Sequence, residues 1–106
     1  MTKAKTPKYS TLKRYGLTSK EWEAMLESQG GTCGVCRKIP ESGRLCTDHE
    51  HVKNWKRMPP EERKRYCRGV LCFQCNHQHL RRGMTLIKAE ALVEYLRRYE
   101  GRKGNE

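Results

Sequence analysis

The sequence predicts a small α+β domain held together by a structural zinc ion, and three observations support this. Two C-x2-C pairs occur in one short chain, one beginning at Cys33 and the other at Cys72. Two short extended stretches, residues 45–47 and 66–71, lie between the pairs, and helical patterns flank them. Because only 35% of the 106 residues are hydrophobic, the core is thin and needs a staple such as a metal.

The chain is strongly basic, with 23 Lys+Arg against 12 Asp+Glu and a net charge of +11. An excess this large favours a polyanionic partner, and we expect nucleic acid. The alternatives are a basic surface that serves only solubility and a ribosomal-type structural protein. No apolar run follows the basic residues 1–8, so we expect no secretory leader, no membrane partner and a cytoplasmic protein (host cell cytoplasm if phage-encoded).

The N-terminal part predicts a tail and two helices. Residues 1–8 are polar and rich in lysine, so we expect a disordered basic tail. Residues 9–15 predict a short helical turn that ends at Gly16. Thr18 and Glu21 have the spacing of a capping box, which predicts a longer helix with Trp22 on its core face. The glycines at residues 30–31 end this helix.

A hairpin is predicted between the two cysteine pairs. After a turn at residues 39–44, the strand at residues 45–47 delivers Asp48, His49 and His51 at its end. The strand at residues 66–71 returns against it, and Gly69 marks a bulge or a close backbone approach. Side chains alternate along a strand, so Asp48 and His49 can serve one site only if the chain bends, and we expect such a bend.

Residues 52–66 form a basic, insertion-like stretch whose contacts the sequence leaves open. Pro60 followed by two acidic residues predicts a short helix, and we expect Trp55 to anchor the stretch to the core. Each cation taken singly is best interpreted as a solvated surface residue. As a group beside the hairpin, however, the cations are expected to contact phosphates of a nucleic acid: Lys53, Lys56, Arg57, Arg63, Lys64 and Arg68.

The C-terminal part predicts two more helices. One covers residues 73–80 and ends by Gly83, and Thr85 caps the last one. The apolar positions of the last helix spread over more than one stripe, so we expect part of this surface to cover the core and the rest to support a homodimer: Leu86, Ile87, Leu92, Val93, Leu96 and Tyr99. Residues 101–106 form a polar end, and the folded domain is expected over residues 9–100.

The two cysteine pairs together predict one metal site. Four thiolates at this spacing are typical of a closed structural Zn²⁺ site: Cys33, Cys36, Cys72 and Cys75. The alternatives are buried cysteines that pair by coincidence, and redox chemistry. A closed zinc has no open coordination position and does not catalyse, and His49-Glu50-His51 does not supply the H-x-E motif of a zinc nucleobase deaminase. Cys46 and Cys67 are interpreted as small core residues.

A second group of polar residues predicts a site for catalysis with its own metal. Asp48 and Asn76 offer hard oxygen donors, which suit Mg²⁺ or Mn²⁺. His49 can take a proton from water near neutral pH, and His51 lies two residues further on. His79 follows Asn76 by one helical turn and could complete the shell of the cation. The alternative for each histidine is a structural role.

These motifs together resemble the phage recombination endonuclease VII family, a branch of the HNH, or ββα-metal (His-Me finger), nucleases. The resemblance spans about residues 15–96. It rests on the first cysteine knuckle and on four further motifs: Tyr-Gly-Leu-Thr (15–18), Asp-His-Glu-His (48–51), Arg-Gly-Val-Leu-Cys (68–72) and Cys-Asn (75–76).

The resemblance implies a hairpin and a helix clamped on zinc, in a DNA endonuclease that hydrolyses phosphodiesters. Asp48 and Asn76 would hold one Mg²⁺ or Mn²⁺ on the scissile phosphate, His49 would be the general base, and His51 would assist at the phosphate. The products would carry 5′-phosphate ends, and the substrate would be branched DNA, such as Holliday junctions, or duplex.

Three departures limit the resemblance. The insertion is long, and His77 and His79 follow Asn76. The member that names the family also has a longer C-terminal part, so junction specificity does not carry over. A non-catalytic zinc-ribbon module that binds nucleic acid is the alternative function, and it leaves Asp48, His49 and Asn76 without a role.

Overall fold

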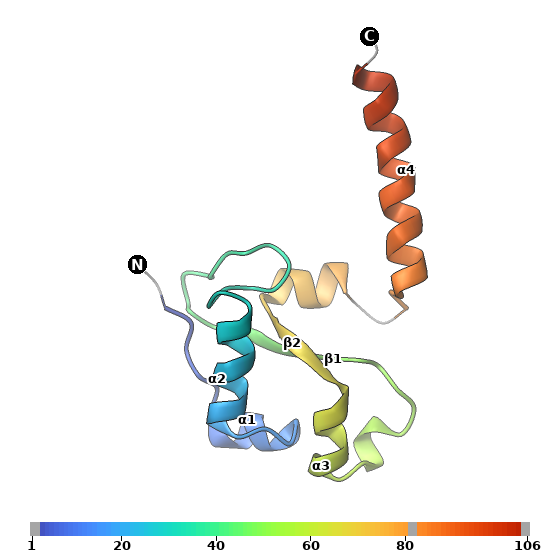
Figure 1. Cartoon of the computed structure of the whole chain (residues 1–106). Coiled ribbons are helices and arrows are strands. Elements are labelled where there is room, and N and C mark those ends of the chain that lie inside the picture. Colours follow the sequence, from blue (N-terminus) through green and yellow to red (C-terminus); the bar gives the residue numbers. More distant parts are fainter. Residues whose placement is uncertain (1–2, 81–82, 105–106) are drawn as a thin grey trace.

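The computed structural model describes residues 3–80 and 83–104 and shows helices around a two-stranded sheet (Figure 1). This arrangement agrees with the predicted mixture of helix and strand. The elements follow one another in this order: α1 (Tyr9–Arg14), α2 (Ser19–Ser28), β1 (Cys46–His49), the 3-10 turn η1 (Trp55–Arg57), α3 (Pro60–Arg63), the 3-10 turn η2 (Lys64–Tyr66), β2 (Cys67–Leu71), the π-helical turn η3 (Cys75–His79) and α4 (Leu86–Gly104).

Helix α2 begins at the predicted capping box. The backbone N–H of Glu21 donates to the Thr18 hydroxyl (3.1 Å), and the Thr18 N–H donates to the Glu21 carboxylate (2.9 Å). Trp22, one residue further on, is fully buried, and its Nε1–H donates to the Thr47 hydroxyl in β1 (3.1 Å). The capping box and this hydrogen bond together set the position of α2 relative to the sheet.

Strands β1 and β2 pair antiparallel, as predicted, and their register changes where the candidate site begins. Asp48 pairs with Gly69, whereas the next residue, His49, pairs with Cys67. Arg68 is therefore an extra residue in β2, which makes a β-bulge at this point. The irregularity between Asp48 and His49 agrees with the bend expected from the sequence.

The side chain of Gln29 completes the edge of β2. Its amide nitrogen donates to the Val70 carbonyl (2.8 Å), and its amide oxygen accepts from the Val70 N–H (2.8 Å). This amide therefore replaces a neighbouring strand at the edge of the sheet. A Cβ atom at Gly69 would lie 2.5 Å from the Gln29 amide oxygen, so a larger residue would push this amide out of its hydrogen bonds with Val70, in agreement with the close approach predicted at Gly69.

The core is small, and it lies between α1, α2 and the hairpin. Trp22, Val70 and Cys33 are fully buried. The other core residues are Leu12, Leu17, Leu45, Leu71 and Cys75. A core of this size buries little apolar surface, which is why a metal staple would matter for stability.

The N-terminal residues lie against the body of the protein. The Lys5 N–H donates to the Gly43 carbonyl (2.8 Å), the Thr6 hydroxyl donates to the Glu23 carboxylate (3.2 Å), and Ala4 packs against the core. Residues 1–2 of the expected tail lie outside the described residues. At the other end, α4 continues to Gly104, so most of the expected polar end is helical.

Helix α4 projects away from the body (Figure 1), and the expectation that part of it covers the core is wrong. Its apolar side chains are exposed, from 46% for Val93 to 82% for Ile87. The radius of gyration is 16.3 Å, against about 13 Å for a compact domain of this length. The core is formed by α1, α2 and the hairpin, and no described side chain of α4 packs into it. Among the described residues, even this helix lacks the apolar stretch needed to cross a bilayer.

Candidate functional site

Four cysteine side chains converge where the first knuckle meets η3. Their sulfur atoms all lie within 4.8 Å of one another, and no other described group of three or more His, Cys, Asp or Glu side chains could hold a metal. The Cys36 and Cys72 sulfurs are 3.8 Å apart. A tetrahedral zinc with Zn–S bonds of about 2.3 Å requires sulfurs about 3.8 Å apart, so the cluster fits this ion.

Backbone N–H groups and burial act on the thiols of this cluster in opposite directions. Burial resists ionisation of Cys33, but N–H groups of the two knuckles, among them that of Val35 (3.4 Å), lower its pKa to about 6. Burial and the neighbouring sulfurs raise the pKa of Cys75. Four sulfurs this close repel one another as thiolates unless a cation lies between them. The predicted cluster is therefore present, and it can hold a structural zinc ion.

Asp48 is buried in the hairpin and paired with the bulge residue. Its side chain is 4% exposed, and both of its oxygens accept hydrogen bonds from the Arg68 guanidinium, at 2.8 and 3.0 Å. Two parallel N–H···O bonds make this the strong, bidentate form of an ion pair. The bulge places Arg68 directly beside Asp48, so the partner of the Arg68 guanidinium is a carboxylate of the protein itself.

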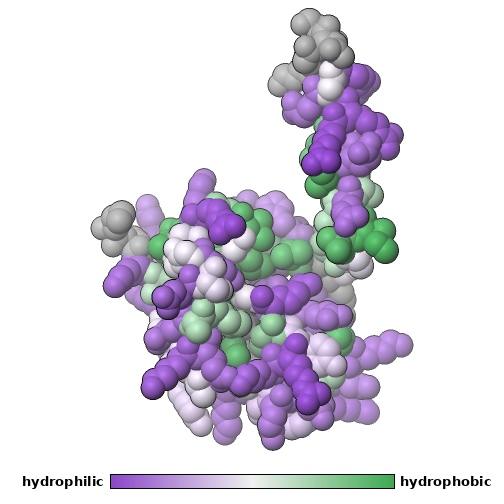
Figure 2. Space-filling view, in the orientation of Figure 1, coloured by the Kyte–Doolittle hydropathy of each residue, from purple (hydrophilic) through white to green (hydrophobic). Residues whose placement is uncertain are grey.

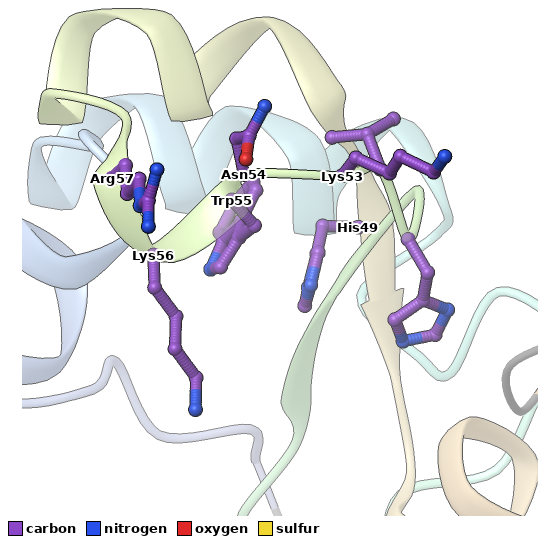
Figure 3. Close-up of a pocket in the computed structure, with 8 residues that line it drawn as sticks. His49, Lys53, Asn54, Trp55, Lys56 and Arg57 are labelled. Carbon is purple, nitrogen blue, oxygen red and sulfur yellow. The ribbon is translucent and has the colours of Figure 1, made fainter.

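His49 lines a cleft of about 560 Å³, which it forms with the basic insertion (Figure 3). Asp48 is not among the residues that line this cleft. Its imidazole stacks on the Trp55 ring, with centroids 4.0 Å apart and planes 19° apart. The His51 ring meets it edge-on at 5.0 Å, and the Tyr15 ring lies at 5.8 Å. Burial lowers the pKa of His49, His51 lowers it further, and Asp48 partly opposes them.

Asn76 lies in the π-helical turn η3, directly after the last cysteine of the cluster. Its N–H donates to the Cys72 carbonyl (3.0 Å), and its side chain lies beside Cys46. Burial raises the pKa of the Cys46 thiol, Cys72 raises it further, and the Asn76 hydrogen bond lowers it. Within the described part of the chain, no hydrogen bond joins Asn76 to Asp48 or His49.

The π-helical turn also changes the relation between Asn76 and His79. The predicted helix over residues 73–80 is present up to His79, but its last turn closes with a hydrogen bond from the Leu80 N–H to the Cys75 carbonyl (2.8 Å). This i+5 turn is wider than an α-helical one, so residues three apart are no longer aligned as they are in an α-helix. His77, between them, stacks on Phe73 with ring centroids 4.2 Å apart.

The six expected phosphate-binding cations divide into two groups. Lys53, Lys56 and Arg57 line the cleft beside His49 (Figure 3). The other three have partners within the protein. Lys64 pairs with Glu21, Arg68 pairs with Asp48, and the Arg63 guanidinium donates to three backbone carbonyls, those of Arg14, Trp55 and Lys56.

The structure thus brings together some of the expected site residues and adds others. His49 and His51 adjoin each other, and Asp48 lies in the same hairpin but lines a depression on the side of Arg68 and Thr85. Sequence reasoning assigned Trp55 only an anchoring role and did not find its stack with His49. The one signal for it was an aromatic residue six positions after His49 in a cationic stretch.

Comparison with known proteins places these residues in a family. The chain is 32% identical over 89 residues to the Gene 59 protein of Mycobacterium phage D29, and 31% identical over 88 residues to that of Mycobacterium phage L5. Each match covers 82% of this chain but only 47% and 43% of the relatives, so the chain spans about half of their length. No solved structure matches the chain significantly. The model of the recombination endonuclease VII family matches residues 8–98, and the chain therefore belongs to the recombination endonuclease VII family.

Proposed function

We propose that this chain is a Mg²⁺- or Mn²⁺-dependent DNA endonuclease of the HNH type, with its hairpin and η3 forming a ββα-metal unit. The observation that carries the proposal is the membership of the family together with a buried Asp48 and a cleft that contains His49 and His51. The nuclease domain would cover residues 9–100, between the tail at 1–8 and the end at 101–106. Such an enzyme would act in the cytoplasm, which is that of the host cell if a phage encodes it.

Asp48 and Asn76 are the proposed ligands of the divalent cation, with His79 as a further candidate. Their oxygen atoms suit Mg²⁺, which keeps several waters and needs few protein ligands. A carboxylate has about four lone-pair sites, so the two hydrogen bonds from Arg68 leave room for a cation at Asp48. When bound, the cation would polarise the phosphoryl oxygen and stabilise the leaving 3′ oxygen.

The remaining steps belong to side chains of the cleft. His49 takes a proton from the attacking water, and its lowered pKa keeps it neutral and able to do so at pH 7. His51 assists at the phosphate. Lys53, Lys56 and Arg57 bind the phosphates of the neighbouring nucleotides, so the affinity for DNA should fall steeply with salt. Branched DNA is the proposed substrate, with ordinary duplex as the alternative.

The test is a nicking assay with Mg²⁺ or Mn²⁺ on the wild type and on His49→Ala. We expect the variant to cut about 10²–10⁴-fold more slowly, because a general base contributes that factor. Its affinity for DNA should stay unchanged, because the cleft cations remain. A four-way junction compared with its linear arms reports the preference for branched DNA.

Failure of the wild type to cut in any metal, with DNA binding intact, would contradict the nuclease. That result would support the zinc-ribbon module that only binds nucleic acid. Equal cutting of the junction and its arms would instead leave the nuclease in place and remove the preference for branches.

We further propose that α4 pairs with α4 of a second copy of this chain. Figure 2 shows apolar side chains on the projecting helix. Two of its three acidic residues lie in the first half and most of its basic residues lie in the second, so antiparallel pairing brings opposite charges together: Glu90 and Glu94 against Arg97, Arg98 and Arg102. Sedimentation should show a dimer that Leu92→Glu dissociates. A wild type that stays monomeric at all concentrations would contradict the pairing.

A further inference from the structure

Arg63 is a main link between the basic insertion and the body. The Arg63 guanidinium donates to the carbonyls of Trp55 (3.1 Å) and Lys56 (3.0 Å) in η1 and of Arg14 (3.0 Å) at the end of α1. The same guanidinium lies 5.5 Å from the centroid of the Trp55 ring. Arg63 thereby ties η1 to α1 and fixes Trp55 between them.

Trp55 in turn covers one face of the imidazole of His49. The two rings are nearly parallel at 4.0 Å, and Tyr15 lies against both of them, 6.1 Å from Trp55 and 5.8 Å from His49. The three rings come from three separate segments of the chain: the end of α1, the end of β1 and the insertion. Figure 3 shows the Trp55 and His49 rings side by side at the cleft.

No hydrogen bond to a described residue orients the His49 ring. Histidines that act as bases are usually oriented by a hydrogen bond from one ring nitrogen, which leaves the other free to react. The neighbouring side chains of Thr47, Asp48 and Arg68 form their hydrogen bonds with other partners. Stacking on Trp55 is therefore the contact that holds the plane of the imidazole. Stacking leaves both ring nitrogens available, because it engages only the face of the ring.

We propose that Trp55 is a positioning residue, which holds the imidazole of His49 in the orientation needed at the cleft, and that Arg63 acts through Trp55. The proposal rests on the proposed function, in which His49 is the general base. It assigns the insertion two tasks: its exposed cations Lys53, Lys56 and Arg57 face the cleft, while Trp55 turns inward onto the base.

The test compares Trp55→Leu, which removes the stacking ring, with Trp55→Phe, which keeps one. We expect Trp55→Leu to lower kcat by about 100-fold, because a displacement of the reacting group by about 1 Å costs that much. KM and the affinity for DNA should stay within about twofold, since the Trp55 ring carries no charge for the phosphates. Trp55→Phe should restore most of kcat. The ring-proton resonances of His49 should move downfield in Trp55→Leu, because the ring current of the indole is lost.

Circular dichroism shows whether each variant is folded, and Lys56→Ala serves as the matched comparison in the same turn. Lys56→Ala should raise KM and weaken its dependence on salt, and leave the His49 resonances in place. Unchanged His49 resonances in Trp55→Leu, or an unchanged kcat, would overturn the proposal. A loss of kcat and of folded signal in both Trp55 variants alike would also overturn it, since that result reports a structural role.

The failure of this proposal is distinguishable from failure of the proposed function. If wild type does not cut DNA, the nuclease is wrong, yet the resonances still report whether Trp55 orients His49. If wild type cuts and His49→Ala does not, while Trp55→Leu matches wild type, only the positioning role is wrong.

Discussion

Replacing Cys75 with serine should unfold the protein under conditions where the wild type is stable. The four thiols converge to within 4.8 Å, and Cys75 is buried among them. Binding of a structural zinc contributes on the order of 10 kcal/mol to folding, which exceeds what a core with three fully buried side chains supplies. Loss of one ligand weakens the site, and the thin core does not compensate. Circular dichroism and metal analysis measure the loss of fold together with the loss of zinc.

Cys67→Ser is the matched control for this prediction. Cys67 lies outside the cluster, its sulfur contacts the carbonyls of Tyr15 and Arg63, and burial raises its pKa to about 11. This variant should keep one zinc per chain and remain folded. A strong chelator should unfold wild type and Cys67→Ser alike. A Cys75→Ser protein that keeps both its zinc and its unfolding temperature would refute the four-thiolate site.

Gly16→Ala should destabilise the protein strongly, although it adds only one methyl group. Gly16 has φ of +72°, and a Cβ atom there would lie 1.9 Å from the carbonyl oxygen of Pro60 in α3. Backbone cannot yield as a flexible side chain does, so α3 must move away from the end of α1. We expect a loss of about 2–4 kcal/mol in the free energy of unfolding, measured with urea.

The effect should extend to the candidate site. Moving α3 weakens the hydrogen bond from Arg63 to the Arg14 carbonyl. Because Arg63 also binds the Trp55 carbonyl, the stacking of Trp55 on His49 is then weakened as well. Gly101→Ala is the control, because Gly101 lies in α4 with no heavy atom within 4 Å of an added Cβ. It should stabilise the helix slightly, by about 0.5–1 kcal/mol. Equal stabilities for Gly16→Ala and wild type would show that α1 and α3 do not approach so closely.

Several elements could be predicted from the sequence because each depends on residues that are near one another in the chain. The capping box of Thr18 and Glu21, the helix start at Pro60 and the C-x2-C knuckles are local patterns. The hairpin follows from two short extended stretches, and Gly69 lies next to the bulge residue Arg68. Joining two knuckles at one ion was a longer-range prediction. The structure confirms its geometric part, because the four sulfurs do converge into one cluster that can hold an ion.

The partners of the charged residues could not be predicted, because the contacts of a lysine or arginine side chain depend on the tertiary fold and not on the neighbouring sequence. Arg63, Lys64 and Arg68 were grouped with Lys53, Lys56 and Arg57, and only packing separated them. The exposure of the apolar side chains of α4 was likewise visible only in the tertiary structure, where α1, α2 and the hairpin form the core.

The amino-acid sequence by itself determined the four-cysteine cluster, the hairpin and the family, since short-range chemistry and spacing suffice for these. Tertiary structure decided that Trp55 lies on His49 and that Arg68 holds Asp48. Arg68 and Asp48 lie on opposite strands of the hairpin, and the bulge brings them together. Trp55 is only six residues from His49, but its ring reaches the imidazole only because the insertion folds back over the end of β1.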